Sequence, residues 1–264
     1  MKEISTAEMK RIQQSILDKV HVFCSEHNIT YFLAAGTLLG AIRHGGYIPW
    51  DDDIDLYMLR EDYDRIESIF NSNPPQNLRL LSLNTERMYT YPFIKIEDTT
   101  TLLLENNNSY ECGINIDVFP IDGIPENQNE IKRLYKKLTF YEALDSIKTT
   151  KLSRTRSLHR NIILALGKVL TSVISLRLLS QKRAACICDH KYDSQYVGEL
   201  STFAYRKQFP RKLFKESTEV LFEGKYYNSP KDWDSFLRLK FGDYMKLPPI
   251  EQQVTHHRFR AYMK

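Results

Sequence analysis

The sequence predicts an α+β fold, in which a mixed sheet flanked by helices is followed by a mostly helical C-terminal part. Two observations predict the sheet: apolar and polar residues alternate after an acidic run at 51–55, and three later segments have strand-like patterns. Helical periodicity from residue 125 onward predicts the rest. We therefore expect a core at 1–125 and a mainly helical part at 126–264, packed together as a single unit.

The first elements can be predicted from local signals. Ser5 and Glu8 have the spacing of a capping box, which predicts the start of a helix. The helix has an apolar face at the spacing expected of core packing, formed by Ile12, Ile16, Val20 and Phe23. Residues 31–35 have the pattern of a buried strand, and residues 38 to about 43 that of a helix.

The elements after the acidic run follow in order. A short helix at 63–70 is terminated by Asn73-Pro74-Pro75. Three strands with polar turns between them are predicted at 78–83, 91–97 and 113–119. A helix is predicted from 125 to about 149. Beyond it we expect mostly helix, with one strand around 222–227.

The acidic run is the strongest functional signal in the chain. Four carboxylates within residues 51–55 repel one another, and a folded protein rarely keeps such a cluster without a cation. Ile54, Leu56 and Met58 alternate with polar positions, so a strand would place Asp53 and Asp55 on one face. That pair suits a hard divalent ion such as Mg²⁺.

Two simpler explanations fit the acidic run less well. A solvated loop would not explain the flanking Ile48-Pro49-Trp50 or the alternation that follows. An EF-hand calcium loop requires Gly at its sixth position, where this chain has Leu56. Upstream, Gly36-Thr37 precedes a predicted helix, whose first backbone N–H groups could face a phosphate. The pattern therefore favours a metal and phosphate site.

Several motifs together resemble the signature of a known family. They are Gly36 to Arg43 followed by Ile48 to Asp55, then residues 116–125, 222–225 and 241–249, in this order along the chain. This pattern resembles the LicD family of phosphotransferases, which belongs to the nucleotidyltransferase superfamily and includes the fukutin-related enzymes. The resemblance extends from about residue 31 to residue 249, and it implies a nucleotidyltransferase-like catalytic core at 1–125.

The resemblance implies three catalytic and metal-binding carboxylates. Asp53 and Asp55 match the Asp-hydrophobic-Asp pair, which would hold Mg²⁺, or Mn²⁺ as an alternative. Asp117 is our choice for the third, because Ile116 and Val118 alternate around it as in a strand. The alternative for Asp117 is a turn or cap residue.

The resemblance also implies groups that bind the nucleotide and its phosphates. Gly36 and Thr37 take the helix-start position, with Thr where Ser is commoner in the superfamily. Arg43, and less securely Lys95, would supply positive charge to the leaving group. A salt bridge to the acidic cluster is an alternative role for Arg43.

The remaining acidic residues receive supporting roles. Asp51 and Asp52, together with Trp50, lie in the loop before the strand, where they would orient the metal ligands from outside. Asp122 is followed by Gly123, a frequent turn pair, so we predict a turn there.

The implied reaction is the metal-dependent transfer of a phospho-alcohol. The donor would be CDP-choline or another CDP-linked alcohol. The acceptor would be a sugar hydroxyl on a cell-surface glycan such as teichoic acid or lipopolysaccharide, or on its lipid-linked precursor, and CMP would leave. Two alternatives stay open: an Asp-x-Asp glycosyltransferase that uses a nucleotide-sugar, and a catalytically silent membrane-associated assembly protein.

Composition agrees with an enzyme of the cytoplasm. The 264 residues are 42% hydrophobic, enough for a full core, and the polar N-terminus lacks the hydrophobic segment of a secretory signal. The four cysteines have no metal-clamp spacing, which favours reduced thiols. No nucleic-acid-binding motif accompanies the net charge of +4.

A basic segment spans residues 148–183. Nine Lys and Arg residues lie between Asp145 and Asp189, without one acidic residue. Within it, Ile162, Leu166, Val169 and Val173 recur at helical spacing. A basic amphipathic helix of this kind can contact the anionic inner face of the cell membrane. Alternatively, it can pack its apolar face on the core, and its basic residues then form a surface for a phosphate-rich substrate. The pattern alone does not separate the two.

Overall fold

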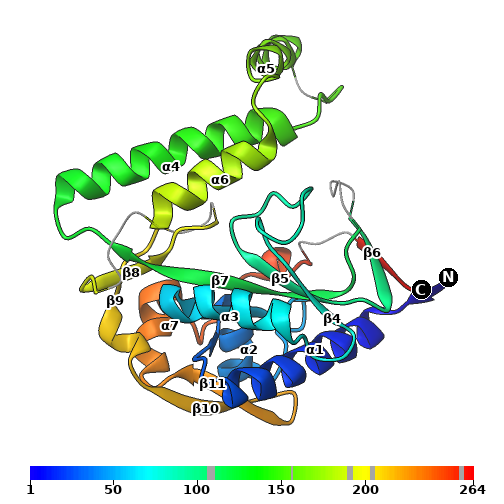
Figure 1. Ribbon diagram of the computed structural model, residues 1–264, viewed down its shortest axis with the longest axis vertical. Helices are drawn as coiled ribbons and strands as arrows, with labels where there is room; N and C mark the ends of the chain where they lie inside the picture. The colour runs from blue at the N-terminus through cyan, green and yellow to red at the C-terminus, as the bar shows by residue number, and fades with distance from the viewer. Residues whose placement is uncertain (106–110, 156, 189–192, 203–205, 256–258) are drawn as a thin grey trace.

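The computed structural model describes residues 1–105, 111–155, 157–188, 193–202, 206–255 and 259–264 (Figure 1). Its α-helices are α1 (Thr6–Glu26), α2 (Ala35–His44), α3 (Arg60–Ser72), α4 (Gln128–Thr149), α5 (Leu158–Leu170), α6 (Leu176–Cys188) and α7 (Trp233–Phe241). Its strands are β1 (Lys2–Ile4), β2 (Phe32–Leu33), β3 (Asp55–Leu59), β4 (Leu78–Leu81), β5 (Ile94–Asp98), β6 (Thr101–Glu105), β7 (Asn115–Ile124), β8 (Tyr196–Glu199), β9 (Phe209–Pro210), β10 (Ser217–Phe222), β11 (Lys225–Pro230) and β12 (Phe259–Met263).

The main sheet is mixed, as predicted. Its strands run in the order β2-β3-β7-β5-β4, and β8 pairs with β7 and β9. β3 and β7 are parallel, whereas the other pairs are antiparallel. A second sheet, β1-β12-β6, brings the two chain termini side by side (Figure 1), and β10-β11 is a hairpin. β7 is the central strand, because it pairs with three others.

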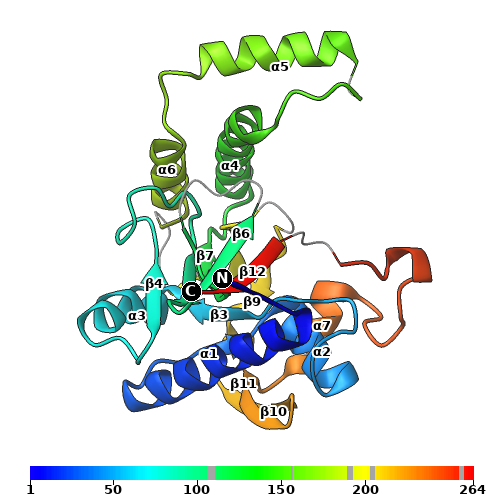
Figure 2. The same ribbon diagram turned by 90° about the vertical axis from the view of Figure 1, so that its right-hand side faces the viewer.

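The helices form two groups. α1, α2 and α3 pack against the main sheet and share one hydrophobic core with it. α4 and α6 lie side by side and have a smaller core of their own, which includes Ile124 at the end of β7. α5 extends across the far end of this pair, away from the sheet (Figures 1 and 2).

Most predicted elements are confirmed. Ser5 caps α1, and its hydroxyl oxygen accepts the N–H of Glu8 at 3.2 Å. Ile16, Val20 and Phe23 on the predicted face are buried. α3 and α4 and the strands β4, β5 and β7 overlap the predicted ranges. The four cysteines are free thiols.

Three predictions need correction. α2 begins at Ala35, three residues before the predicted helix start. Residues 222–227 are not one strand: Glu223 and Gly224 have φ of 49° and 79° and form the turn between β10 and β11. The chain after Cys188 is also less helical than expected, because β8 to β12 lie there. β8 and β12 find their partners far away in sequence, in β7, β1 and β6, so local patterns were weak guides.

Candidate active site

One row of side chains crosses three strands at the centre of the main sheet. Asp55 on β3 pairs in register with Asp117 on β7, and Asp117 pairs with Lys95 on β5. Residues in register on neighbouring strands lie about 5 Å apart and on the same face. Lys95 Nζ donates to both Asp117 oxygens, at 2.6 and 2.9 Å. The fold thus brings three of the predicted site residues together.

Backbone contacts hold this row in place. The Asp55 N–H donates to Thr37 Oγ1 at 2.9 Å, and the Asp55 carbonyl accepts the N–H of Ala34 at the same distance. The Asp117 N–H donates to the Ile54 carbonyl at 2.9 Å. The buried Thr37 therefore fixes the start of β3 with its oxygen, while its hydroxyl hydrogen can still be donated.

The charge at Asp55 is not balanced within the protein. Burial raises the pKa of Asp55 well above the usual 3.8, and the neighbouring carboxylates Asp53, Asp117 and Asp51 raise it further, whereas Lys95 lowers it. Asp53 lies two residues before the start of β3, close enough to Asp55 to raise its pKa. The carboxylates around Asp55 therefore outnumber the lysines nearby, a condition that a bound cation relieves.

The residues fit a magnesium site. Among the residues described here, no three acidic, His or Cys side chains already converge in a metal-binding geometry. Mg²⁺ needs only one or two carboxylates, because it keeps several waters and uses substrate phosphates as further ligands. Asp53 and Asp55 supply two such carboxylates, and the Asp117 carboxylate binds Lys95 in this structure.

The raised pKa of Asp55 makes a prediction about stability without metal. A carboxyl whose pKa is raised on folding penalises the folded state once pH exceeds its unfolded value, so the penalty grows as pH rises above 3.8 and is lost toward pH 3.8. In chelator, Asp55→Asn should therefore raise the Tm at pH 7, and the gain should vanish as pH falls. Thermal unfolding at several pH values measures this change in Tm. Asp193→Asn is the control, because the side chain of Asp193 is exposed. An Asp55→Asn gain that grows on acidification would contradict the assignment.

Gly36 allows the carboxylate of Asp51 to approach the start of α2. A Cβ at this position would lie 2.4 Å from Asp51 Oδ2. Ala34 caps the helix without a side-chain hydrogen bond, and its neighbour Ala35 has a φ of 41°. Asp51 thus occupies the helix N-terminus, where a negative charge is favoured. The predicted phosphate position at Gly36 is the place where Asp51 lies in this structure.

A small cavity opens beside the carboxylate row. It measures about 50 Å³ and is lined by Asp52, Asp53, Lys95 and Asp117 among others. That volume suits an ion with a water or two and is far below the space that a nucleotide needs. The body of a nucleotide donor would therefore lie outside it.

Sequence reasoning missed Gln13, which connects α1 to this cavity. Gln13 Nε2 donates to the carbonyl of Asp52 at 3.1 Å and to that of Asn115 at 3.4 Å. Its Oε1 accepts the hydroxyl of Tyr47 at 3.1 Å. One amide side chain therefore holds the acidic loop against the start of β7.

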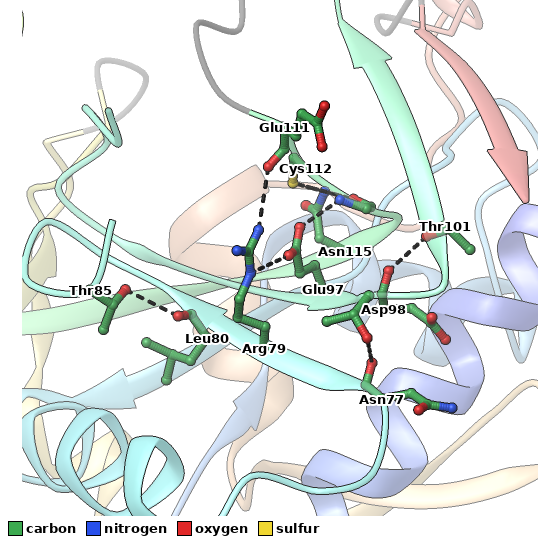
Figure 3. Close-up of polar contacts among 12 residues, drawn as sticks. Asn77, Arg79, Leu80, Thr85, Glu97, Asp98, Thr101, Glu111, Cys112 and Asn115 are labelled. Carbon is green, nitrogen blue, oxygen red and sulfur yellow. Dashed lines mark hydrogen bonds and ion pairs between the residues drawn. The ribbon is translucent and has the colours of Figure 1, made fainter. Parts of the chain in front are cut away.

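A polar network positions Lys95 from the other side. Asn115 Oδ1 accepts from Lys95 Nζ at 3.1 Å, and Asn115 Nδ2 donates to the Gly113 carbonyl at 2.9 Å. The buried Glu97 accepts from Arg79 Nε at 2.6 Å and from the Gly113 N–H at 2.5 Å (Figure 3). The turn before β7 is thereby fixed to β5, and Lys95 is fixed with it.

A second lysine, also missed, lies near Asp55. Lys240 Nζ donates to the hydroxyl of Tyr57 at 2.8 Å, and Tyr57 follows Asp55 by two residues on β3. Burial lowers the pKa of Lys240, while Glu199 and Asp55 raise it. Lys240 directly precedes the motif at 241–249, and this adjacency was the one signal in the sequence.

Arg43 and Trp50 lie at the C-terminal end of α2. Arg43 Nη1 donates to the carbonyl of Tyr244 at 2.8 Å, and its Nε contacts His44 Nε2 at 2.9 Å. Trp50 packs edge-to-face on His44, with ring centroids 6.4 Å apart. Arg43 thus joins the first motif to the last, whereas Lys95 is the predicted cation that contacts a carboxylate of the row.

The prediction of a turn at Asp122 is wrong. β7 continues through Asp122 to Ile124, and the Asp122 carboxylate is buried. It accepts from Arg60 Nε at 2.7 Å and Arg60 Nη2 at 2.9 Å. Burial raises the pKa of Asp122, and Arg60 opposes that shift. Asp-Gly stays in the strand because this bidentate partner at the start of α3 compensates the buried charge.

Asp122→Asn should therefore destabilise the protein by about 3–5 kcal/mol, since it leaves Arg60 without its buried partner. Urea unfolding measures the change. Asp64→Asn is a matched control, because Asp64 also pairs with Arg60, at 3.3 Å, but its side chain is 49% exposed. An exposed pair is worth about 1 kcal/mol or less. Equal losses in the two variants would contradict this ranking.

Comparison with known proteins identifies the family. A sequence model described as the nucleotidyltransferase domain of LicD, FKTN and FKRP matches residues 28–161, which include α2 and the carboxylate row. Lipopolysaccharide cholinephosphotransferase LicD of Haemophilus influenzae is 31% identical over 270 aligned positions, which cover the full length of both chains. The chain belongs to the LicD family.

Other relatives of this LicD-family chain share shorter segments. Human ribitol 5-phosphate transferase FKRP is 49% identical over 41 residues, which are 16% of this chain and 8% of the relative. An uncharacterised protein of Rickettsia typhi is 38% identical over 68 residues, or 22% of each chain. The expected link to the fukutin-related enzymes is confirmed, and the LicD-family chain is an enzyme of the phosphotransferase class.

Proposed function

We propose that the chain transfers a phospho-alcohol, in the first place phosphocholine from CDP-choline, to a sugar hydroxyl of a cell-surface glycan or its lipid-linked precursor. The observation that carries this proposal is the row formed by Asp55, Asp117 and Lys95, in a chain whose full-length relative is a lipopolysaccharide cholinephosphotransferase. A cytoplasmic site of action, at the membrane face that presents such precursors, is part of the proposal.

The reaction exchanges the phosphoanhydride bond of the donor for a phosphodiester bond to the acceptor. The acceptor hydroxyl oxygen forms a bond to the phosphorus that carries the alcohol, the bond from that phosphorus to CMP breaks, and the hydroxyl proton passes to a base. Asp117 is our choice for this base, because it lies at the centre of the row. Both of its carboxylate oxygens accept from Lys95 Nζ, which holds the carboxylate in place.

The other residues of the site stabilise the negative charge on the phosphates of the donor. Asp53 and Asp55 would hold Mg²⁺, or Mn²⁺, which when bound neutralises negative charge on the phosphoryl oxygens. Lys95 supplies a buried positive charge in the same row. The Thr37 hydroxyl and the start of α2 offer hydrogen-bond donors to the phosphates, a role that would require Asp51 to move from Gly36.

Membership of a phosphotransferase family disfavours the two alternatives that the sequence had left open. A glycosyltransferase would use its Asp-x-Asp pair with a nucleotide-sugar, and a silent relative would bind neither donor. The unbalanced charge at Asp55 disfavours the silent relative, because a protein without activity gains nothing from buried like charges.

The change in Tm caused by each candidate ligand distinguishes these three functions. A ligand that binds the folded state stabilises it by about 2.7 kcal/mol at one hundred times its Kd. We expect CDP-choline with Mg²⁺ to raise the Tm more than CMP, CDP-ribitol or CDP-glycerol. Selective stabilisation by a UDP- or GDP-sugar would favour the glycosyltransferase, and stabilisation by none of them would favour the silent relative.

A further inference from the structure

The apolar residues of α5 face outward. Large apolar side chains recur along the helix and are 50–80% exposed, and Val173 just beyond is 89% exposed; the helical ones are Leu158, Ile162, Ile163, Leu166, Val169 and Leu170. We call these seven residues the α5 apolar face. The opposite side contacts α4, where Gly167 approaches Ile147 so closely that a Cβ would lie 3.1 Å from it. The structure thus disfavours the simple expectation that this stripe packs on the core.

The charges of the basic segment divide into two groups. Arg177 and Arg183 point inward: Arg177 donates to the carbonyls of residues 83, 86 and 87, and the buried Arg183 donates to the Ser201 carbonyl. Lys148 and Lys168 are half-buried and bond to carbonyls at the junction of α4 and α5. Arg156 lies outside the described residues.

The exposed group lies next to the apolar face. Arg154 and Arg160 flank the start of α5 and are exposed, as are Lys151 and Lys182. No acidic residue occurs between Asp145 and Asp189 in the sequence. A surface that combines exposed large apolar side chains with positive charge is complementary to an anionic lipid surface.

The shape of the molecule agrees with that partner. α5 lies at the extremity furthest from the sheet and crosses the ends of α4 and α6 (Figures 1 and 2). Its 13 residues span about 20 Å, too short to cross a bilayer but long enough to lie in its interface. None of the helices described here is long and apolar enough to span a membrane.

We propose that the α5 apolar face and its exposed basic flank dock on an anionic lipid bilayer. The apolar side chains enter the boundary between headgroups and acyl chains, and Arg154 and Arg160 bind the headgroup phosphates. α5 then lies in the plane of the membrane. This inference goes beyond the proposed reaction and does not depend on the identity of the donor.

Cosedimentation of the full chain with vesicles tests the proposal. The vesicles contain phosphatidylcholine alone, or equimolar phosphatidylcholine and phosphatidylglycerol. We expect binding to the anionic vesicles only, and weaker binding as salt rises. Ile162→Asn with Leu166→Asn should abolish it. Arg154→Gln with Arg160→Gln should weaken it roughly tenfold or more, since each basic residue at such a surface contributes about 1 kcal/mol.

Two matched controls keep the test specific. Ile250→Asn removes an apolar side chain that is 83% exposed elsewhere, and Lys132→Gln with Arg133→Gln removes two exposed charges from the start of α4. Both should bind vesicles like the wild type, and all variants should keep its far-UV circular dichroism. Absence of binding to anionic vesicles at low salt would overturn the proposal. The proposal would also be overturned if Ile162→Asn with Leu166→Asn left vesicle binding intact but converted a wild-type dimer into a monomer. The α5 apolar face would then be a subunit interface.

Discussion

Asp55→Asn should lower turnover by about 10³-fold or more while the protein stays folded. The change removes one of the two carboxylates proposed to hold the metal, and a bound metal contributes several kcal/mol of transition-state stabilisation. The backbone bonds of Asp55 to Thr37 and Ala34 do not involve its carboxylate, so β3 should keep its place. Initial rates of CMP formation measure the loss, and excess chelator should reproduce it in the wild type.

The matched control for this variant is Asp193→Asn, which neutralises an exposed carboxylate outside the site. It should retain the wild-type rate. Near-wild-type turnover of Asp55→Asn, or full activity of the wild type in chelator, would contradict the proposed metal site.

Asp117→Asn should lower turnover by about 10²-fold or more, as expected for the loss of a general base or a metal ligand. Lys95 would lose its ion-pair partner, but Asp55 and Asp53 remain nearby to offset its charge. The variant should therefore fold. Turnover per folded molecule is the quantity to measure, with folded protein determined by circular dichroism.

Asp122→Asn is the informative comparison for Asp117, because both aspartates lie on β7 and only Asp117 faces Lys95. Asp122→Asn should lose stability and keep most of its turnover per folded molecule. The reverse ranking would mean that the third catalytic carboxylate has been assigned to the wrong aspartate.

The site could be predicted from sequence where its signals are local. The alternation around residues 53–58 predicted that Asp55 points to one face of a strand, and the pattern at 114–118 did the same for Asp117. The register of β3, β7 and β5 then placed both of them in one row with Lys95. The acidic run and the resemblance it carries were therefore enough to identify the family.

Other parts of the site depend on contacts between distant residues. Gln13 on α1 reaches the acidic loop and has no distinctive neighbourhood in the sequence, whereas Lys240 on α7 reaches Tyr57 and is marked only by its position before the motif at 241–249. Asp122 was misread because Asp-Gly is a common turn pair, whereas its partner Arg60 lies 62 residues away. Local propensity yields to such tertiary pairing, which a pattern within one segment does not reveal.

The identity of the nucleotide that is released tests the proposed reaction most directly. The full chain is incubated with Mg²⁺, a glycan acceptor fraction and, in parallel reactions, CDP-choline, a UDP-sugar or a GDP-sugar. We expect CMP from CDP-choline together with phosphocholine on the glycan, and neither product with chelator or with Asp55→Asn. Release of UDP or GDP from a nucleotide-sugar, with CDP-choline left intact, would contradict the proposed reaction.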